Sequence, residues 1–343
     1  MSGAPAISVL MPVRDGERFL AEAVESVLAQ TFHDLELVVV DDGSTDSTPR
    51  MLERIAERDP RLVVHRQRPG RNLAETLNTA AEISRAPLLA RLDADDVALP
   101  DRLRLQADFL AANPEVALLG GQALVIDEVG HEFGRAEYPT HDEELREALR
   151  TGNPFVHPAV LIRREAFEAV GGYRLDFDYA EDLDLWLRIA VGRGIANLPD
   201  ALIRYRIHGG QQSVNKEAEQ AVFALAARAS ARARAVGEAD PFADAVIDEA
   251  LLLSQGISPE EISEAVVAAT TWIGRTTARA GYRNDARRLF DAALARARSE
   301  SGSPALVASV HRSMAHLHAE QGHRVRAKLE AAQARLAERG SPR

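Results

Sequence analysis

The sequence predicts an α/β protein with a mostly parallel sheet that carries helices on both faces, followed by an all-α region. Short β-branched segments alternate with segments of helical spacing in the N-terminal part of the chain, which is the pattern of a parallel sheet covered on both faces. Clusters of aspartate follow two of these segments, at the strand ends where such sheets bind ligands. From residue 216 onward, strand signals give way to segments rich in Ala, Arg and Glu with helical spacing.

Strands and helices are expected to follow one another in order along the first part of the chain. The expected strands are residues 6–13, 35–40, 61–67 and 87–92. The expected helices are residues 16–30, a helix opened by the polar turn within 41–57, residues 72–84, and a helix starting at Pro100. Apolar residues recur every three or four positions in these helical segments. We therefore predict two domains, residues 1–215 and residues 216–343, in agreement with the length of the chain.

Composition excludes several classes of protein. The net charge of −11 argues against a nucleic-acid partner, because binding to phosphate backbones needs a basic face. The absence of cysteine excludes disulfides and thiolate metal sites. The only lysines are Lys216 and Lys328, so the first domain holds neither a P-loop lysine nor a Schiff-base lysine. The sequence also shows no leader pattern and no run of roughly 20 apolar residues, so we expect the protein in the cytoplasm.

The segment ARLDADDVALPDRL, residues 90–103, concentrates the carboxylates of Asp93, Asp95 and Asp96 between an apolar run and a helix start. Like charges this close need a cation or hydrogen-bond donors, or one of them takes up a proton. Aspartates that complement the N-terminus of a helix are one explanation. The aspartyl-phosphate phosphatase signature DxDx(T/V) is another, although those enzymes use a downstream lysine and none follows before Lys216.

Two further segments place acidic residues before helices. VVVDDGSTDST ends a strand with Asp41 and Asp42. An aspartate there can accept the imide N–H of a pyrimidine base or a ribose hydroxyl, and the polar turn can also simply cap the next helix. In AEDLDLWLRIA, Glu181 and Asp182 precede an apolar helical pattern, which fits either a general base or the charged first turn of an amphipathic helix.

Taken together, the segments resemble an inverting family 2 glycosyltransferase with the GT-A fold. The four segments that carry the resemblance are, in order, ISVLMPVRDGERFLAEAVESVLAQTF, LELVVVDDGSTDST, RLDADDVALPDRL and AEDLDLWLRIA. The resemblance covers residues 6–215 and does not reach the helical tail.

The resemblance implies a nucleotide-diphosphate sugar donor, with UDP as the expected carrier. Asp42 would contact the nucleotide base, with Asp41 beside it and Pro12 lining the pocket. Family members usually have an aromatic residue where this chain has Arg14, so stacking on the base would come from the guanidinium plane. Arg71 is a further candidate for nucleotide binding.

The resemblance also implies a divalent metal, Mg2+ or Mn2+, and a general base. Asp93 and Asp95 match the DxD motif, whose second aspartate binds the metal that holds the diphosphate. His208 stands where many GT-A enzymes have a histidine that helps to bind the metal or the diphosphate. Asp182 would be the general base of the inverting transfer.

Three further residues are expected around the donor and acceptor, namely His157, Gly172 and Glu181. His157 can equally be a packing histidine in a Pro-flanked loop. Gly172 permits a close approach of backbone to substrate, or it ends the preceding helix.

The expected reaction moves one sugar to a hydroxyl of a glycan or lipid-linked acceptor in the synthesis of envelope polysaccharide or glycoconjugate. The Gln-Arg-Trp motif of processive synthases is absent from the sequence, which favours the transfer of a single sugar. The alternatives are a phosphatase with Asp93 as nucleophile and a catalytically silent scaffold built from helical repeats.

The tail contains a weak internal repeat. Residues 277–297 and 317–337 share a turn at Gly281 and Gly322, and the offset of 41 residues between the two turns indicates stacked helical hairpins or, equally, an appended helical bundle. Such hairpins need neighbours, so we expect either self-association into a homo-oligomer or packing on the catalytic domain. The Arg-rich residues 226–235 could touch anionic lipid, or they form a solvated helix face. Contact with lipid would place the protein peripherally at the inner face of the membrane.

Overall fold

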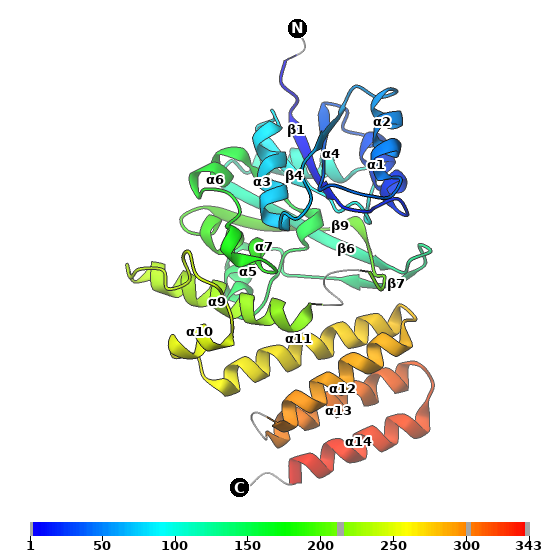
Figure 1. Cartoon of the computed structure of the whole chain (residues 1–343), viewed down its shortest axis with the longest axis vertical. Helices are drawn as coiled ribbons and strands as arrows, with labels where there is room; N and C mark the ends of the chain where they lie inside the picture. The colour runs from blue at the N-terminus through cyan, green and yellow to red at the C-terminus, as the bar shows by residue number, and fades with distance from the viewer. Residues whose placement is uncertain (1–2, 211–215, 300–302, 340–343) are drawn as a thin grey trace. The chain divides into compact units, whose positions relative to one another are not determined.

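The computed structural model describes residues 3–210, 216–299 and 303–339. The chain divides into two compact units (Figure 1). The first unit comprises Met1–Ile126 and Gly130–Arg206, and the second comprises Asp127–Val129 and Ile207–Arg343. The domain boundary predicted after residue 215 lies at the edge of residues 211–215, outside the described residues, and stays a prediction.

The first unit alternates strands and helices as the sequence predicts up to residue 112. Its strands are β1 (Ile7–Val13), β2 (Leu35–Asp41), β3 (Leu62–Arg66), β4 (Leu88–Arg91), β5 (Val97–Ala98), β6 (Val116–Ile126), β7 (Glu132–Ala136), β8 (Leu161–Arg163) and β9 (Gly194–Arg206). Its α-helices are α1 (Leu20–Leu28), α2 (Thr48–Ala56), α3 (Leu73–Ile83), α4 (Arg102–Ala112), α5 (Asp142–Leu149), α6 (Arg164–Ala169) and α7 (Glu181–Ile189). The expected elements between residues 6 and 112 are confirmed, whereas the strands that follow α4 were not predicted individually.

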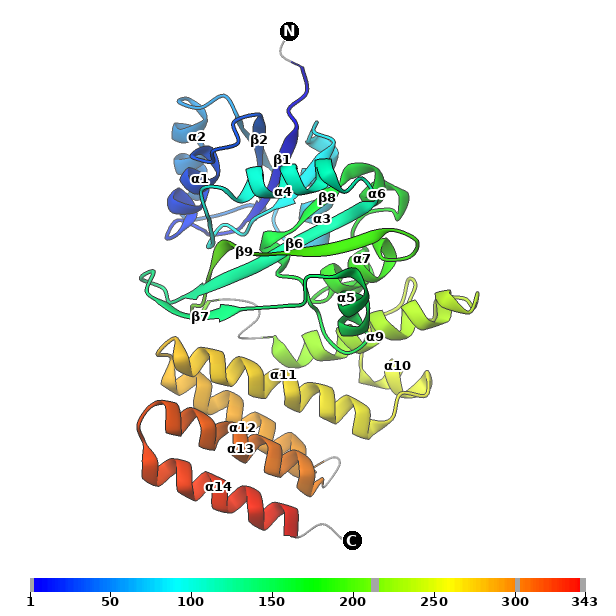
Figure 2. The same ribbon diagram turned by 180° about the vertical axis from the view of Figure 1, so that it is seen from behind.

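The strands form one sheet in the order β3-β2-β1-β4-β8-β6-β9-β5. The remaining strand, β7, pairs with the last residues of β6. The pairs β1–β2, β1–β4 and β2–β3 are parallel, as predicted. Beyond β4 the sheet is mixed, because β8 pairs antiparallel with both β4 and β6, while β6 and β9 are parallel. Helices α1 and α4 lie on one face of the sheet and α3 on the other (Figures 1 and 2).

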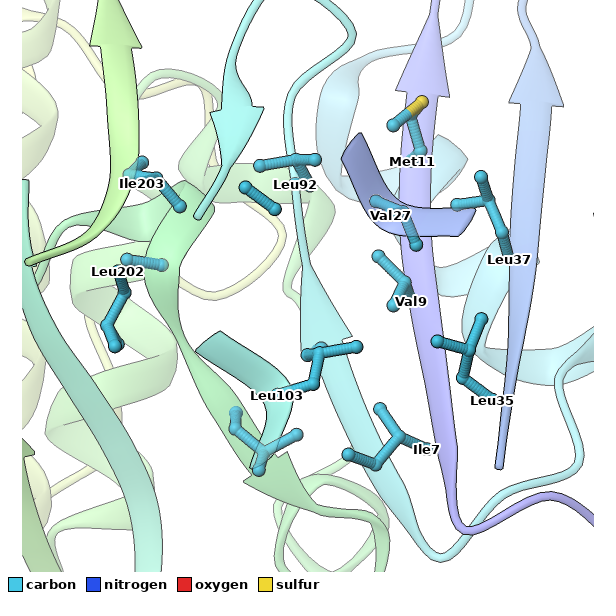
Figure 3. Packing of buried hydrophobic residues seen from close by; sticks show 14 of the residues in the cluster. Ile7, Val9, Met11, Val27, Leu35, Leu37, Leu92, Leu103, Leu202 and Ile203 are labelled. Atoms are coloured by element: carbon cyan, nitrogen blue, oxygen red, sulfur yellow. The ribbon is translucent and has the colours of Figure 1, made fainter. Parts of the chain in front are cut away.

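The main hydrophobic core of the first unit lies between the sheet and α1 and α4. Ile7, Val9 and Met11 alternate along β1 and point to the same face of the sheet. Val27 of α1 and Leu103 of α4 cover that face (Figure 3). All seven residues of β1 are buried, as is usual for a central parallel strand covered on both sides. This packing fixes the carboxyl end of β1, where the site begins.

The second unit is helical. Its helices are α9 (Glu217–Ala235), α10 (Glu249–Ser254), α11 (Pro259–Arg279), α12 (Arg283–Ser299), α13 (Pro304–Glu320) and α14 (Arg324–Arg339). Helices α11 and α12 pack as one hairpin and α13 and α14 as a second. Among the described residues, no helix is both long enough and apolar enough to cross a bilayer.

The predicted repeat is confirmed in the turns of the two hairpins. Gly281 and Gly322 both have a positive φ, +94° and +75°, a conformation that glycine adopts without strain. The next residue in each turn reaches back to the helix, so that the Tyr282 N–H donates to the Thr277 carbonyl at 3.0 Å. The His323 N–H donates to the carbonyl of residue 318 in the same way, at 2.7 Å. Both hairpins therefore end their first helix with the same glycine-dependent cap.

Candidate active site

Asp41, the last residue of β2, holds the turn that follows its own strand. Its side chain is buried, and Oδ1 accepts a hydrogen bond from the Ser44 N–H at 2.8 Å. Arg66 of β3 lies beside it, with Nε 3.5 Å from Oδ2. Because Oδ1 accepts this hydrogen bond, Asp41 helps to fix the conformation of the turn after β2.

Asp42 is buried next to Asp41 but faces different groups. Oδ1 accepts from the side-chain amide of Gln67 at 3.2 Å, and Oδ2 lies 3.6 Å from a guanidinium nitrogen of Arg14. The Arg14 side chain is 56% exposed, so water screens this weak ion pair. The two residues therefore combine a buried acceptor with a planar, accessible cation.

Pro12 is buried in β1, opposite Val40 of β2. The pairing of β1 with β4 ends at Leu10, whose carbonyl accepts from the Leu92 N–H. Every second residue of a strand faces the same neighbouring strand, so Pro12, like Leu10, faces β4. Pro12 lies beyond the last residue of β1 that pairs with β4, and its missing N–H therefore falls outside this pairing. The sheet loses no hydrogen bond to this proline.

Asp15 ties the loop after β1 to the turn after β2. Its Oδ1 accepts from the Thr45 N–H at 2.7 Å, and its own N–H donates to Ser44 Oγ at 2.8 Å. The Thr45 N–H holds the pKa of Asp15 below its usual value. Asp15 has a positive φ of 50°, a conformation tolerated better by aspartate than by most residues. Asp15 therefore has a structural role in joining these two loops.

Arg71 lies at the start of α3, where its half-exposed side chain forms an ion pair with Glu75. Asn72 caps the same helix by accepting the Glu75 N–H at 2.9 Å. The loop before it packs against Gly43, because a Cβ at this glycine would lie 2.7 Å from the Cβ of Pro69. This packing brings the segment that contains Arg71 next to the turn after β2, and binding of nucleotide by Arg71 stays a prediction.

Asp93, Asp95 and Asp96 lie directly after β4, and one oxygen of each carboxylate lies within 4.8 Å of the others. Asp93 accepts from Arg91 at 2.5 Å and keeps a side chain that is 29% exposed. Burial, opposed by Arg91 and reinforced by Asp95, raises the pKa of Asp93 to about 6. Burial, with Asp95 and Asp93 nearby, raises the pKa of Asp96 well above its usual value.

Arg206, the last residue of β9, holds this acidic loop. Its backbone N–H donates to Asp96 Oδ1 and its Nε donates to the carbonyl oxygen of Asp95, both at 2.8 Å. The guanidinium also donates to Glu22 of α1 at 2.6 Å and lies 4.7 Å from the centre of the Phe19 ring. One buried arginine thus connects the loop to β9 and α1.

A second buried arginine supports the strand end that precedes the same loop. Arg102 of α4 donates to the carbonyl oxygens of Arg91 at 2.7 Å and Val160 at 3.3 Å. Burial and the neighbouring Arg91 lower the pKa of Arg102 to about 9. The carbonyls that receive its hydrogen bonds belong to β4 and to the segment before β8, so Arg102 fixes the strand end that presents the aspartates.

Asp182 lies in the first turn of α7. Its two oxygens accept from the Asn153 side-chain amide at 2.7 Å and the Leu183 N–H at 2.6 Å. Burial raises the pKa of Asp182, and these two donors oppose the increase. Burial together with Asp182 raises the pKa of the adjacent Glu181 well above its usual value. Two neighbouring carboxylates with raised pKa values are typical of acid–base sites.

His157 lies next to these carboxylates in an aromatic environment. Its Nε2 is 2.8 Å from the hydroxyl of Tyr173 and its Nδ1 is 3.8 Å from Glu181. The ring meets Trp186 of α7 edge-on, with ring centres 5.7 Å apart. Burial, and less so Arg91, holds the pKa of His157 well below its usual value. The histidine is therefore neutral and fixed between Glu181 and Tyr173.

Arg91 connects the two acidic groups electrostatically. Burial lowers and the Asp93 carboxylate raises the pKa of this arginine, and the net shift is upward. Burial raises the pKa values of Asp182 and Glu181, and Arg91 partly offsets that increase. Burial also raises the pKa of Asp93, with a smaller contribution from Asp182. The aspartates after β4 and the carboxylates at the start of α7 are therefore close enough to influence one another's pKa values.

Gly172 and His208 have local partners in the structure. Gly172 has φ +70°, and a Cβ there would lie 2.8 Å from Asn78 Oδ1, so it ends the segment after α6 without space for a side chain. His208 follows β9 within the second unit, and its Nδ1 accepts from the Gly210 N–H at 3.2 Å. The proposed roles of both residues toward ligands stay predictions.

The carboxylates after β4 fit a divalent cation by their chemistry. Mg2+ and Mn2+ prefer oxygen ligands, and carboxylates supply both the oxygens and the charge. Oδ2 of Asp96 is buried and has no hydrogen-bond partner among the described residues. An orphaned buried oxygen in a group of three carboxylates is a feature that a cation would satisfy.

The chain resembles known proteins in sequence and in fold. The family model described as Glycosyl transferase family 2 matches residues 8–171. The amylovoran biosynthesis glycosyltransferase AmsE of Erwinia amylovora is 33% identical over 213 residues, which cover 61% of this chain and 78% of AmsE. The chain belongs to glycosyl transferase family 2.

Solved structures show the same fold at low sequence identity. The mannosyltransferase PcManGT of Pyrobaculum calidifontis, in complex with GDP-Man and Mn2+, has a TM-score of 0.53 and 20% identity over 98% of this chain and 87% of PcManGT. TarS 1–349 of S. aureus, in complex with UDP-GlcNAc, has a TM-score of 0.54 and 16% identity over 96% of this chain and 91% of that structure. The family 2 glycosyltransferase thus has the GT-A fold, and its family membership decides against the phosphatase and scaffold alternatives.

In this glycosyltransferase, sequence reasoning found the carboxylates of the site but missed the residues that hold them. The missed residues are Arg91, Arg102, Asn153, Tyr173 and Arg206. Arg91 left a signal in the sequence, because it lies two residues before Asp93 at the end of a strand, where alternate side chains point the same way. Arg206 left none, because it lies 111 residues from the carbonyl of Asp95 to which it donates.

Proposed function

We propose that this family 2 glycosyltransferase transfers a single sugar, with inversion and with a divalent metal, from a nucleotide-diphosphate sugar to a hydroxyl acceptor. The observation that supports this most is the group of three carboxylates directly after β4, Asp93, Asp95 and Asp96, whose oxygens lie within 4.8 Å of one another. A glycosyl transfer needs a group that neutralises the diphosphate close to a base that receives the acceptor proton. The carboxylates after β4 would hold a cation that neutralises the diphosphate, and Asp182 would receive the proton.

UDP is the proposed carrier, and the loops after β1 and β2 are its proposed binding site. Asp42 would accept the imide N–H of the base, Arg14 would stack on its face, and Pro12 and Asp41 would shape the pocket. Arg71 lies on the neighbouring loop and would meet the phosphates. TarS was solved with UDP-GlcNAc and PcManGT with GDP-Man, which makes the carrier base the part of the proposal that needs a direct test.

Asp93 and Asp95 would hold Mg2+ or Mn2+ together with Oδ2 of Asp96, which has no hydrogen-bond partner in the described part of the chain, and His208 would be a further ligand to the metal or the diphosphate. When bound, the cation supplies positive charge at the departing diphosphate. The Mn2+ in the PcManGT complex supports the same kind of site here. Arg206 and Arg102 hold the strand end and loop that carry these carboxylates.

Asp182 is the proposed general base. The acceptor oxygen attacks the anomeric carbon from the face opposite the diphosphate, its proton passes to a carboxylate oxygen of Asp182, and the bond to the diphosphate oxygen breaks with its electron pair. Asn153 and the Leu183 N–H orient the carboxylate. Glu181, His157 and Gly172 would line the pocket around donor and acceptor.

The acceptor is proposed to be a glycan or a lipid-linked sugar of an envelope polysaccharide or glycoconjugate. AmsE carries the name of a polysaccharide biosynthesis enzyme, which supports this class of acceptor. The first test is a thermal-shift screen of UDP, GDP and dTDP sugars with and without Mn2+, because a bound ligand raises the stability of the native state. A shift with UDP sugars that depends on Mn2+ supports the proposal, and a shift independent of metal contradicts it.

Inversion has its own test. The anomeric configuration of the newly formed bond is followed by NMR during transfer from the donor that the screen identifies. A product of opposite configuration to the donor is expected, and retention of configuration would exclude Asp182 as the base of a single displacement.

A further inference from the structure

Helix α14 carries an apolar face formed by Val325, Leu329, Ala332 and Leu336, here called the α14 outer face. The exposed fractions are 82% for Val325, 57% for Leu329 and 66% for Leu336. Spacings of four, three and four residues place these side chains in one stripe along the helix. The buried Ala334 lies about half a turn around the helix from this stripe. The α14 outer face therefore points away from the hairpin core.

The repeat shows that this face is not a general feature of the hairpins. The residues 41 positions earlier, in α12, are Asn284, Arg288, Asp291 and Ala295, and all of them are exposed. Three of the four are polar or charged, as expected for a solvated helix face. At the corresponding positions α14 has only apolar residues.

Cations flank the α14 outer face on both sides. Arg326 lies on one side of the stripe and Lys328 and Arg335 on the other, and all three are exposed. The two acidic residues of the helix are turned toward α13 instead. Glu330 accepts from His311 at 2.6 Å, and Glu338 pairs with Arg312. The outward surface is therefore apolar in the middle and basic at both edges.

We propose that the α14 outer face binds the surface of a membrane that contains anionic lipid. An apolar stripe with Lys and Arg at its edges lies in the plane of such a surface, with the stripe below the headgroups and the cations at the phosphates. The long aliphatic stems of Arg326, Lys328 and Arg335 allow this arrangement. This inference is independent of the proposed transfer reaction, because none of these residues belongs to the catalytic site.

Charge disfavours a second copy of the chain as the occupant. In an antiparallel pair of α14 helices whose stripes face each other, the same edge of both helices meets, so Lys328 of one copy lies near Arg335 of the other. Like charges directly opposite each other destabilise such a pair. A flat anionic surface instead satisfies the cations on both edges at once.

The Arg-rich segment 226–235, which the sequence suggested for lipid contact, is less exposed than the α14 outer face. Ala226, Ala227 and Ser230 are buried, and Arg234 pairs with Asp240 at 2.9 Å. The segment offers no exposed apolar stripe comparable with that of α14. The membrane contact predicted from the sequence is therefore assigned to the last helix.

Vesicle binding by the full-length chain tests the proposal. Sedimentation is compared for vesicles of phosphatidylcholine alone and of phosphatidylcholine mixed with phosphatidylglycerol in equal parts. Binding is expected only with the anionic mixture, and salt should weaken it. Replacing both Arg326→Gln and Arg335→Gln should weaken binding roughly 25-fold, about fivefold for each cation. The matched control is Arg287→Gln with Arg288→Gln, which removes the same charge from α12.

The apolar part is tested by Leu329→Gln with Leu336→Gln, which should reduce binding about tenfold or more. The control pair is Val246→Gln with Leu253→Gln, since both side chains are exposed outside α14, at 87% and 46%. All four positions are exposed, so unfolding temperatures should stay close to that of the parent chain. Equal binding by the variants and their controls would overturn the proposal. A dimer in vesicle-free solution that the Leu329 and Leu336 changes break would also overturn it, and would assign the face to a second copy.

Discussion

At the scale of single residues, the carboxylates of the site are of two kinds. Some hold loops in place and have a lowered pKa, and others, among them the proposed base, have a raised pKa. Asp15 lies among backbone N–H donors, which keep its pKa low. Asp182 also has two donors, yet burial still raises its pKa. A base that is buried but oriented by hydrogen bonds is easily protonated and correctly placed, as general-base catalysis requires.

The variant Asp182→Asn should lose transfer and keep donor binding. An amide cannot accept the acceptor proton, so the turnover rate should fall by about two to four orders of magnitude. Calorimetry should give an unchanged donor affinity, because the base acts on the acceptor. Glu165→Gln, an exposed change on α6, is the control. A large loss of donor affinity in Asp182→Asn would mean that this carboxylate binds the donor instead.

The rate of transfer should depend on pH through Asp182. Burial raises its pKa, so the base takes up a proton at a higher pH than a free aspartate, whose pKa is about 3.9. Transfer needs the unprotonated form, and the rate should therefore fall as pH decreases through this raised pKa. The maximal rate is measured with metal, donor and acceptor saturating, while circular dichroism confirms that the chain stays folded. A rate that remains constant down to about pH 4 would exclude Asp182 as the base.

Arg206 should control the affinity for metal without taking part in the reaction. Arg206→Met removes the hydrogen bond to the Asp95 carbonyl, which leaves the acidic loop less well held. The Mn2+ concentration for half-maximal activity should rise roughly 10- to 100-fold, the usual effect of losing a residue that orients metal ligands. The maximal rate should return at high Mn2+. Arg204→Met, an exposed position in the same strand, should change neither quantity.

At the scale of elements, the apolar runs predict β1 to β4 and the helical spacing predicts α1 to α4, because local periodicity reports which face is buried. The same reasoning missed β6 and β9. Gly120 and Gly121 interrupt the pattern of β6, and Pro199 interrupts that of β9, and such residues usually mark strand ends. The structure supplies the reason for the glycine, since a Cβ at Gly120 would lie 2.2 Å from Asn197 Oδ1. Contacts between distant segments cannot be derived from local spacing.

A substitution at Gly43 tests the packing between the turn after β2 and the loop before α3. It has φ +69°, and a Cβ would meet Pro69 at 2.7 Å, so Gly43→Ala combines backbone strain with a clash. The free energy of unfolding, from urea titration, should fall by about 1 to 3 kcal/mol, and nucleotide affinity should fall with it because the turn beside Asp42 moves. Gly70→Ala separates the two effects. Gly70 has φ +100° but no atom within 4 Å of a Cβ, so it should show the strain alone and keep nucleotide affinity.

At the scale of the whole molecule, each of the two units has its own hydrophobic core. The main core of the first unit gathers side chains from β1, β2, α1 and α4, and the core of the second unit gathers side chains from α11, α12 and α13. The proposed nucleotide, metal and base residues, apart from His208, belong to the first unit. The family resemblance predicted that unit from motif order, whereas the helical sequence pointed only to residues 226–235 as a candidate for lipid contact.

The last prediction concerns a chain shortened to end at Lys216. Because the first unit has its own core and holds Asp42, Asp95 and Asp182, the short chain should fold, bind the donor and hydrolyse it slowly. It should lose binding to anionic vesicles, which we assign to α14, and it should lose transfer to the natural acceptor, its state of association, or both. Light scattering and transfer assays on cell-envelope extracts compare it with the full chain. Full transfer and an unchanged number of chains per particle would show that the helical unit has neither role. An insoluble short chain would show that the helices complete the fold of the first unit, which would contradict the independence of the two cores.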